Sequence, residues 1–164
     1  MRIYTAGYGN LGFDGFIDRL RLYAITHLVD VRSVPQSSYW EDFRRQRLEQ
    51  IVPATGLRYV YMGDTLGGVR DSPVLCKEPA KIDIAPLFTE PTLAIGIEKL
   101  LKAAADPTRV ICLMCGCLRP HKCHRSRLVG EELVRRGVEV MHLDESGQPI
   151  SQQQLAAQTQ QSLF

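Results

Sequence analysis

The sequence predicts an α/β protein, a single-domain three-layer sandwich in which helices cover both faces of a mostly parallel sheet. Short runs typical of strands alternate along the chain with segments whose apolar residues recur at helical spacing. The run Arg109–Met114 is almost continuously apolar, which is typical of a strand buried on both faces. The chain has 164 residues, no internal repeat and no linker-like stretch, so we expect one domain.

The predicted elements alternate between strand and helix. Strands are expected at Ile3–Ala6, His27–Val31, Leu57–Tyr61, Arg109–Met114 and Val138–Leu143. Helices are expected at Phe13–Leu20, Asp42–Ile51, Leu93–Ala104 and His124–Arg136. The first of these helices has its apolar residues at i, i+3, i+4 and i+7, which form one helical face.

Two stretches are less regular. Residues 62–86 are rich in glycine and proline, and such a long irregular segment inside a domain is usually functional or mobile. Residues 149–151 are expected to cap a final, Gln-rich helix. We therefore divide the chain into an α/β domain at residues 1–144 and a helical Gln-rich tail at residues 145–164.

Composition excludes several classes of protein. No apolar run approaches the roughly 20 residues of a membrane span, and the N-terminus has no signal-peptide pattern, so a cytoplasmic protein is expected. The formal net charge is +2, which leaves any affinity for nucleic acid to local clusters of basic residues. The odd number of cysteines, five, argues against a full disulfide framework.

Polar residues follow the predicted strands, at the sheet edge where open parallel sheets bind ligands. Gly7 and Tyr8 follow the first strand, and either form a tight turn or let a ligand approach the backbone. Asp30 and Arg32 lie at the end of the second strand and project to the same side. They either neutralise each other, or Arg32 binds an anionic group while Asp30 orients it or acts as an acid or base.

Two further segments combine cations with groups that could bind a ligand. The loop after the third strand contains Gly67 and Arg70, a permissive backbone beside a cation. Tyr39 and Trp40 precede a basic helix, and aromatic residues beside cations suit nucleobases and phosphates. The alternative for this second segment is an ordinary charged surface over packed aromatic rings.

The segment after the fourth strand holds the densest chemistry. Residues 119–127 contain no acid and four cations, Arg119, Lys122, Arg125 and Arg127. They open a predicted helix, whose N-terminal N–H groups favour an anion, although cations there oppose the helix dipole. We interpret the segment as an anion-binding site; the alternative is a solvated basic loop.

The cysteines allow three interpretations, since four of the five lie between residues 112 and 123. Cys115 at a strand end and Cys123 at a helix start, with cations nearby, are positions where the pKa of a thiol falls, which gives a nucleophile or a sulfur carrier. Cys112, inside the strand, is expected to be a plain core residue. The remaining alternative is a zinc site. Its ligands would be Cys115, Cys117, Cys123 and either His124 or His121, although this spacing departs from the common pairs of zinc ligands.

Four motifs stand in order along the chain: IYTAGYGN, LVDVRSVPQSS, GLRYVYMGDTLGGVR and VICLMCGCLRPHKCHRSRLVGEELVRRGVEVMHL. Together they resemble the domain of unknown function 488 family, over about residues 2–144. The resemblance implies an α/β fold and a site at the positions that match the family's motifs, which are Gly7, Asp30, Arg32, Pro35, Ser37, Gly67, Arg70, Cys115, Cys123, His124 and Arg125.

One departure bears on activity. Where many members of that family carry an acidic residue two positions after the first cysteine, this chain has Cys117, so an activity that needs the acid would be lost or altered. A weaker, fold-level likeness is to rhodanese-type sulfurtransferases. It is carried by the VDVR strand end and by a cysteine loop that leads into a helix, and it is an analogy of fold alone.

Three functions follow. The leading hypothesis is an enzyme, a hydrolase or transferase, acting on a phosphate-bearing nucleotide or nucleic acid at a basic site on the carboxyl edge of the sheet. Its expected catalytic residues are Asp30, Cys115, Cys123 and His124. Its expected substrate-binding residues are Gly7, Tyr8, Arg32, Ser37, Gly67, Arg70, Lys122 and Arg125.

The alternatives are cysteine-dependent sulfur transfer or other thiol chemistry, and a non-catalytic nucleic-acid-binding or zinc-stabilised module. The leading hypothesis requires no cofactor and no membrane, and its partner is an anionic small molecule or a nucleic acid. Zinc enters only with the metal-ligand interpretation of the cysteines.

Overall fold

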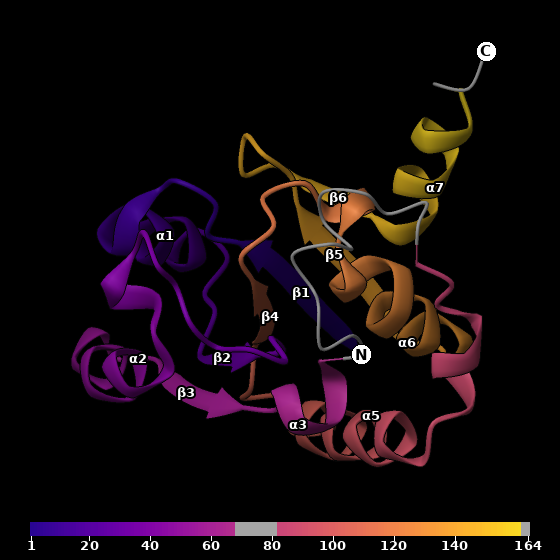
Figure 1. The fold of residues 1–164 in the computed structure, drawn as a ribbon, viewed down its shortest axis with the longest axis horizontal. Helices are drawn as coiled ribbons and strands as arrows, with labels where there is room; N and C mark the ends of the chain where they lie inside the picture. The colour runs from indigo at the N-terminus through magenta and orange to yellow at the C-terminus, as the bar shows by residue number, and fades with distance from the viewer. Residues whose placement is uncertain (68–81, 162–164) are drawn as a thin grey trace.

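The predicted α/β class and mostly parallel sheet are confirmed by a computed structural model, which describes residues 1–67 and 82–161 (Figure 1). Within these residues the strands form one six-stranded sheet in the order β3-β2-β4-β1-β5-β6. They are β1 (Arg2–Gly7), β2 (His27–Asp30), β3 (Arg58–Tyr61), β4 (Ile111–Cys115), β5 (Glu139–Leu143) and β6 (Pro149–Ser151).

The first five strands pair in parallel, and β6 runs antiparallel to β5. The central strand β4 is buried at every residue, in agreement with its almost continuously apolar sequence. Parallel pairing places the carboxyl ends of β1, β2 and β4 at the same edge of the sheet. The strand-end residues singled out above therefore lie along one edge.

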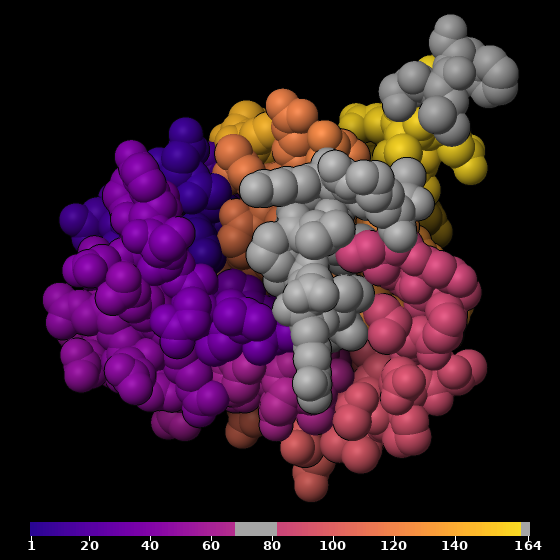
Figure 2. Space-filling view, viewed as in Figure 1, coloured from indigo at the N-terminus to yellow at the C-terminus, as the bar shows by residue number. Residues whose placement is uncertain are grey.

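Helices cover both faces of the sheet. The described helices are α1 (Gly12–Arg21), α2 (Arg45–Ile51), α3 (Gly63–Leu66), α5 (Pro91–Ala104), α6 (Glu131–Arg135) and α7 (Gln152–Gln161). The helices α1 and α2 pack on one face and share a core with Leu28, Cys112 and Met114. The helices α5 and α6 pack on the other face, where their core includes Val29 and Leu113. Both views show α1 and α2 on one side of the molecule and α5 on the other (Figure 1, Figure 2).

The helix expected at His124–Arg136 differs from the prediction. It begins as a π-helix at Arg125–Gly130 and becomes α-helical only at α6. A π-helix is wider than an α-helix, is rare, and often marks a functional site. Apolar periodicity locates a helix but does not separate these two forms over so few residues.

The helix expected at Asp42–Ile51 is also divided, into a 3₁₀ turn at Glu41–Phe43 and α2. Its cations form exposed ion pairs with acids of the same segment, Arg44 with Glu41, Arg45 with Glu49 and Arg47 with Asp42. Exposed pairs of this kind contribute little to stability. They do place an acid beside each of these cations, so the helix carries less net positive charge than its arginines alone suggest.

Residues 149–151 were expected to cap the last helix and instead form β6. A strand of three residues is too short to show an alternating pattern, and β5 supplies the pairing that holds it. The Gln-rich segment after it is helical as predicted, and Gln152 and Leu155 are buried. The boundary between domain and tail at residue 144 remains a prediction. Within the predicted tail, β6 pairs with β5 and so extends the sheet of the α/β domain.

None of the helices in the described ranges is both long and apolar enough to cross a membrane.

A buried cysteine and histidine site

Cys115 is the last residue of β4, at a point where chain connections change sides of the sheet. The strands on either side of β4 are β1 and β2, which lead to α1 and α2 on one face. In contrast, β4 leads to the π-helix and α6 on the other face. In open α/β sheets the ligand crevice forms outside the carboxyl ends of strands at such a point. The topology therefore favours a site at Cys115.

Three buried side chains meet at this strand end, those of Cys115, Cys123 and His124. The Nδ1 atom of His124 lies 4.0 Å from Cys115 Sγ and 3.8 Å from Cys123 Sγ. The Nε2 atom of the same ring lies 2.9 Å from the carbonyl oxygen of Val31. Because a carbonyl oxygen can only accept a hydrogen bond, Nε2 carries a proton and Nδ1 faces the two sulfur atoms.

The three groups change one another's pKa. A hydrogen bond from Cys123 and the neighbouring His124 lower the pKa of Cys115 well below its usual value, against the opposing effect of burial. Burial raises the pKa of Cys123 well above its usual value, and Cys115 raises it further. Burial alone would lower the pKa of His124, but the charge of Cys115 and its hydrogen bond raise it. The arrangement favours a thiolate on Cys115 beside a protonated His124.

Gly7 allows the cysteine loop to lie directly against the end of β1. A Cβ atom at position 7 would lie 1.9 Å from the carbonyl oxygen of Cys117 and 2.9 Å from the Cα atom of Leu118. The next two residues bind the same loop, because the N–H of Tyr8 donates to Cys115 O and the N–H of Gly9 donates to Gly116 O, both at 3.1 Å. The structure thus places the protein's own backbone against Gly7.

Arg125 follows His124 and is fully buried. Its Nη1 donates to Thr5 Oγ1 and its Nη2 to the carbonyl oxygen of Leu118, both at 3.1 Å. Its Nε atom has no hydrogen-bond partner within the described part of the chain. The bond to Leu118 ties the cysteine loop to the start of the π-helix, so Arg125 helps to fix the separation of Cys115 and Cys123.

Asp30 and Arg32 form a second buried cluster, on the opposite face of the sheet. Side chains alternate along β2, so Asp30 projects to the α1 and α2 face, whereas Val29 and Val31 project to the face of Cys115. Arg32 forms an ion pair with Asp30 and donates to Tyr8 Oη at 3.1 Å, and both charged groups are buried. The sheet therefore separates this pair from the cysteines.

Tyrosines complete the second cluster. The hydroxyl of Tyr59 donates to Asp30 Oδ2 at 2.7 Å, and burial together with the charge of Asp30 raises the pKa of Tyr59. Tyr8 stacks on Phe43 with ring centroids 3.9 Å apart. The Asp30 carboxylate and the Arg32 guanidinium therefore form their hydrogen bonds with each other and with Tyr59 and Tyr8.

The remaining predicted residues lie elsewhere. Ser37 Oγ accepts a hydrogen bond from the N–H of Trp40 at 2.9 Å and so shapes the loop after β2. Gly67 packs on Ser33, where an added Cβ would come within 2.6 Å of the serine Cβ. Lys122 lies in a 3₁₀ turn before Cys123. Arg70 is outside the described residues. The side chains of Cys117 and His121 are not part of the group formed by Cys115, Cys123 and His124.

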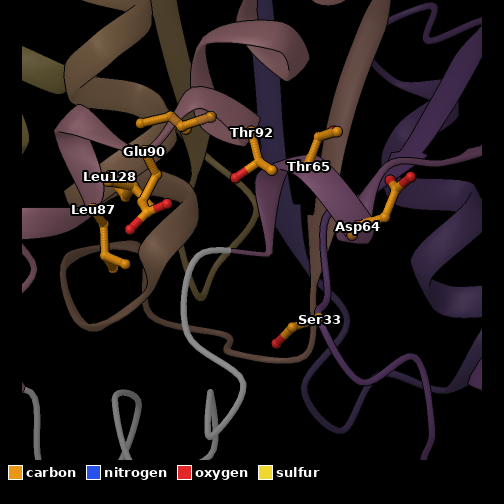
Figure 3. Close-up of a pocket in the computed structure, with 9 residues that line it drawn as sticks. Ser33, Asp64, Thr65, Leu87, Glu90, Thr92 and Leu128 are labelled. Atoms are coloured by element: carbon orange, nitrogen blue, oxygen red, sulfur yellow. The ribbon is translucent and has the colours of Figure 1, made fainter.

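A cavity of about 680 Å³ is bordered by Leu93 and Leu128 (Figure 3), which belong to the same core as Cys115. Ser33 borders it two residues beyond Val31, which holds His124, and Leu128 borders it one turn beyond His124. Glu90 and Thr92, at the start of α5, approach it from another side (Figure 3). This volume is in the range of small-molecule pockets.

Thr5, His142 and Gln152 form a buried polar group next to Arg125 that the sequence did not indicate. Thr5 and His142 lie on neighbouring strands, and Gln152 reaches them from the start of α7. Each is a polar residue at a position that only the packed sheet and the π-helix define. No spacing along the chain could have revealed them.

The fold and the site together define an open α/β protein with a buried cysteine–histidine centre at the carboxyl end of its central strand. A family model described as "Domain of unknown function DUF488" matches residues 12–131. The chain belongs to this family, as its motifs predicted. A search of curated proteins and a search of solved structures found no match. The family segment includes Cys115, Cys123 and His124, whereas β1, β5, β6 and α7 lie outside it.

Proposed function

We propose that this protein is a cysteine-dependent group-transfer enzyme in which Cys115 is the nucleophile and His124 its proton partner. The observation that carries the proposal is the orientation of His124, with Nδ1 toward both sulfur atoms and Nε2 bound to Val31. A nucleophile beside a base that a third group orients is the usual arrangement for covalent catalysis. Cys123 supports it, because the neighbouring thiol helps to lower the pKa of Cys115.

The geometry supports thiol chemistry more than the phosphate-binding hypothesis. That hypothesis requires Arg32 and Arg125 to reach a ligand. Arg32 is paired with Asp30, and the two Nη atoms of Arg125 donate to Thr5 and Leu118. Cys115 and His124 face each other instead, so they are the better candidates for chemistry.

The proposed reaction is redox-neutral. The Cys115 thiolate forms a bond to an electrophilic atom of the substrate, and the bond to the leaving group breaks. The leaving group takes the electron pair and the proton of the His124 imidazolium. An acceptor that loses its proton to His124 then displaces the thiolate and takes the transferred group. The reacting atom of the substrate must reach Cys115 Sγ, and we place the rest of the substrate in the cavity bordered by Ser33 and Leu128.

Alkylation with iodoacetamide, located by mass spectrometry across a range of pH, tests this proposal. We expect Cys115 to react with a midpoint well below the usual thiol pKa of about 8.5. Changing His124→Gln should move the midpoint upward, because the imidazolium no longer stabilises the thiolate. Cys112 is the matched control, since burial raises its pKa to about 12 and it lies on the same strand. A Cys115 that behaves like Cys112 would overturn the proposal.

A zinc site is the second candidate, because one observation favours it independently. The donor atoms of Cys115, Cys123 and His124 all lie within 4.8 Å of one another. A histidine ligand commonly donates its other ring N–H to a backbone carbonyl, as Nε2 of His124 does to Val31. Two thiolates and one imidazole suit zinc with a fourth position left open.

Elemental analysis separates the two candidates. Protein purified under reducing conditions without chelator should contain one zinc per chain if the three groups are ligands. A variant with both Cys115→Ser and Cys123→Ser should then lose the metal, while Cys112→Ser should keep it. Zinc-free wild-type protein favours the free thiolate.

A further inference from the structure

A chain of buried polar contacts runs from Arg125 to the start of α7. Thr5 Oγ1 accepts from Arg125 Nη1 at 3.1 Å and lies 2.8 Å from His142 Nδ1. His142 Nε2 lies 2.5 Å from Gln152 Oε1. Gln152 Nε2 in turn donates to Glu131 Oε1 at 2.5 Å. The side chains of Thr5, His142 and Arg125 are fully buried.

The donors and acceptors of this chain have one consistent assignment. Gln152 Oε1 only accepts, so His142 Nε2 carries the ring proton. His142 Nδ1 then accepts from the hydroxyl of Thr5, which leaves the Thr5 oxygen to accept from Arg125. A neutral His142 agrees with its pKa, which burial, with the nearby Arg125, lowers to about 4.

The same contacts surround the π-helix. Ser126 Oγ donates to Gln152 Oε1 at 3.1 Å. Gly130 packs so closely that an added Cβ would lie 2.8 Å from Gln152 Oε1 and 3.4 Å from His142 Cε1. Gln152 therefore touches both ends of the segment Arg125–Gly130. The first residue of this segment follows directly after His124, so its position sets that of His124 and Cys123.

We propose that Gln152 and His142 are positioning residues for the cysteine–histidine site, acting through the π-helix and Arg125. This inference rests on the proposed function, since it concerns the placement of His124 against Cys115. Both residues lie outside the family segment 12–131. In this chain β5, which carries His142, and α7, which begins with Gln152, would thus complete a site whose reacting groups all come from the family segment.

The test compares Gln152→Ala with Gln153→Ala, since Gln153 is the exposed neighbour on the same helix. Two readouts are needed: the iodoacetamide rate at Cys115 at one pH, and the ¹⁵N imidazole signals of the four histidines. Gln152→Ala should slow alkylation by about tenfold, a usual effect of losing an orienting partner, and should move the His124 signal. Gln153→Ala should change neither.

A double variant, Glu131→Gln with Gln152→Glu, tests whether the Cys115 rate can be restored. It keeps the hydrogen bond between positions 131 and 152 but reverses its donor and acceptor. Recovery of the Cys115 rate in this double variant supports positioning. A folded Gln152→Ala protein with a lower melting temperature, but with unchanged Cys115 rate and His124 signal, would overturn it. If wild-type Cys115 is itself unreactive, the proposed function fails, and the His124 signal alone decides this inference.

Discussion

Arg32 and Asp30 form a two-pronged ion pair, with Arg32 Nη2 2.6 Å from Asp30 Oδ2 and Arg32 Nε 2.9 Å from Asp30 Oδ1. The backbone N–H of Arg32 also donates to Asp30 Oδ1 at 3.1 Å. The pair projects away from the face that carries Cys115. Two polar clusters thus share one edge of the sheet, and the sheet lies between their side chains.

Removing one member of the buried pair should destabilise the fold strongly. Arg32→Ala leaves the Asp30 carboxylate buried without its cation, so we expect the free energy of unfolding to fall by about 3–5 kcal/mol. Urea denaturation measures the change. Arg21→Ala is the control, because its pair with Asp18 is exposed and should contribute at most about 0.5 kcal/mol. Equal losses in the two variants would contradict a desolvated pair.

Two glycine substitutions should have opposite effects. Gly7→Ala places a methyl group 1.9 Å from Cys117 O, so the cysteine loop must shift and stability should fall. Gly15→Ala lies inside α1 with its nearest neighbour at 3.8 Å, and should stabilise by about 0.5–1 kcal/mol through helix propensity. Thermal unfolding of both variants checks the prediction. A harmless Gly7→Ala would show that the loop does not depend on this contact.

His142 should make stability depend on pH. Burial lowers its pKa from 6.5 to about 4 in the folded state, so between these values the unfolded chain binds the proton more readily. Stability should therefore fall as pH drops from 6.5 toward 4, by up to roughly 3 kcal/mol from this residue. Denaturation of wild type and His142→Asn across this pH range measures how much His142 contributes to the pH dependence of stability. The variant should show a shallower slope, and parallel slopes would count against a neutral, buried His142.

Much of the fold was predictable from sequence because apolar patterning reports burial directly. The run Arg109–Met114 indicated a strand buried on both faces, and β4 is buried at every residue. Whether a helix is α, π or 3₁₀ was harder to predict from sequence. The π-helix at Arg125–Gly130 contacts Gln152 and His142, which come later in the chain. Likewise β6 exists because β5 pairs with it.

The candidate site was predictable in part. The clustering of Cys115, Cys123 and His124 in sequence indicated thiol or metal chemistry, and the structure brings these three together. Asp30 and Arg32 also lie at the expected edge, but residue alternation along β2 turns them to the other face. A sequence places strand ends at an edge more readily than it assigns the face that each side chain occupies.

The ultraviolet absorbance of the thiolate, titrated in chelator-treated protein, tests the central claim most directly. Wild type and Cys115→Ser are compared across pH, and the difference between them reports the thiolate that depends on Cys115. We predict a transition well below the usual thiol pKa of about 8.5, because Cys123 and His124 stabilise the Cys115 thiolate. A difference that appears only at or above that value would contradict the thiolate–imidazolium pair and the function built on it.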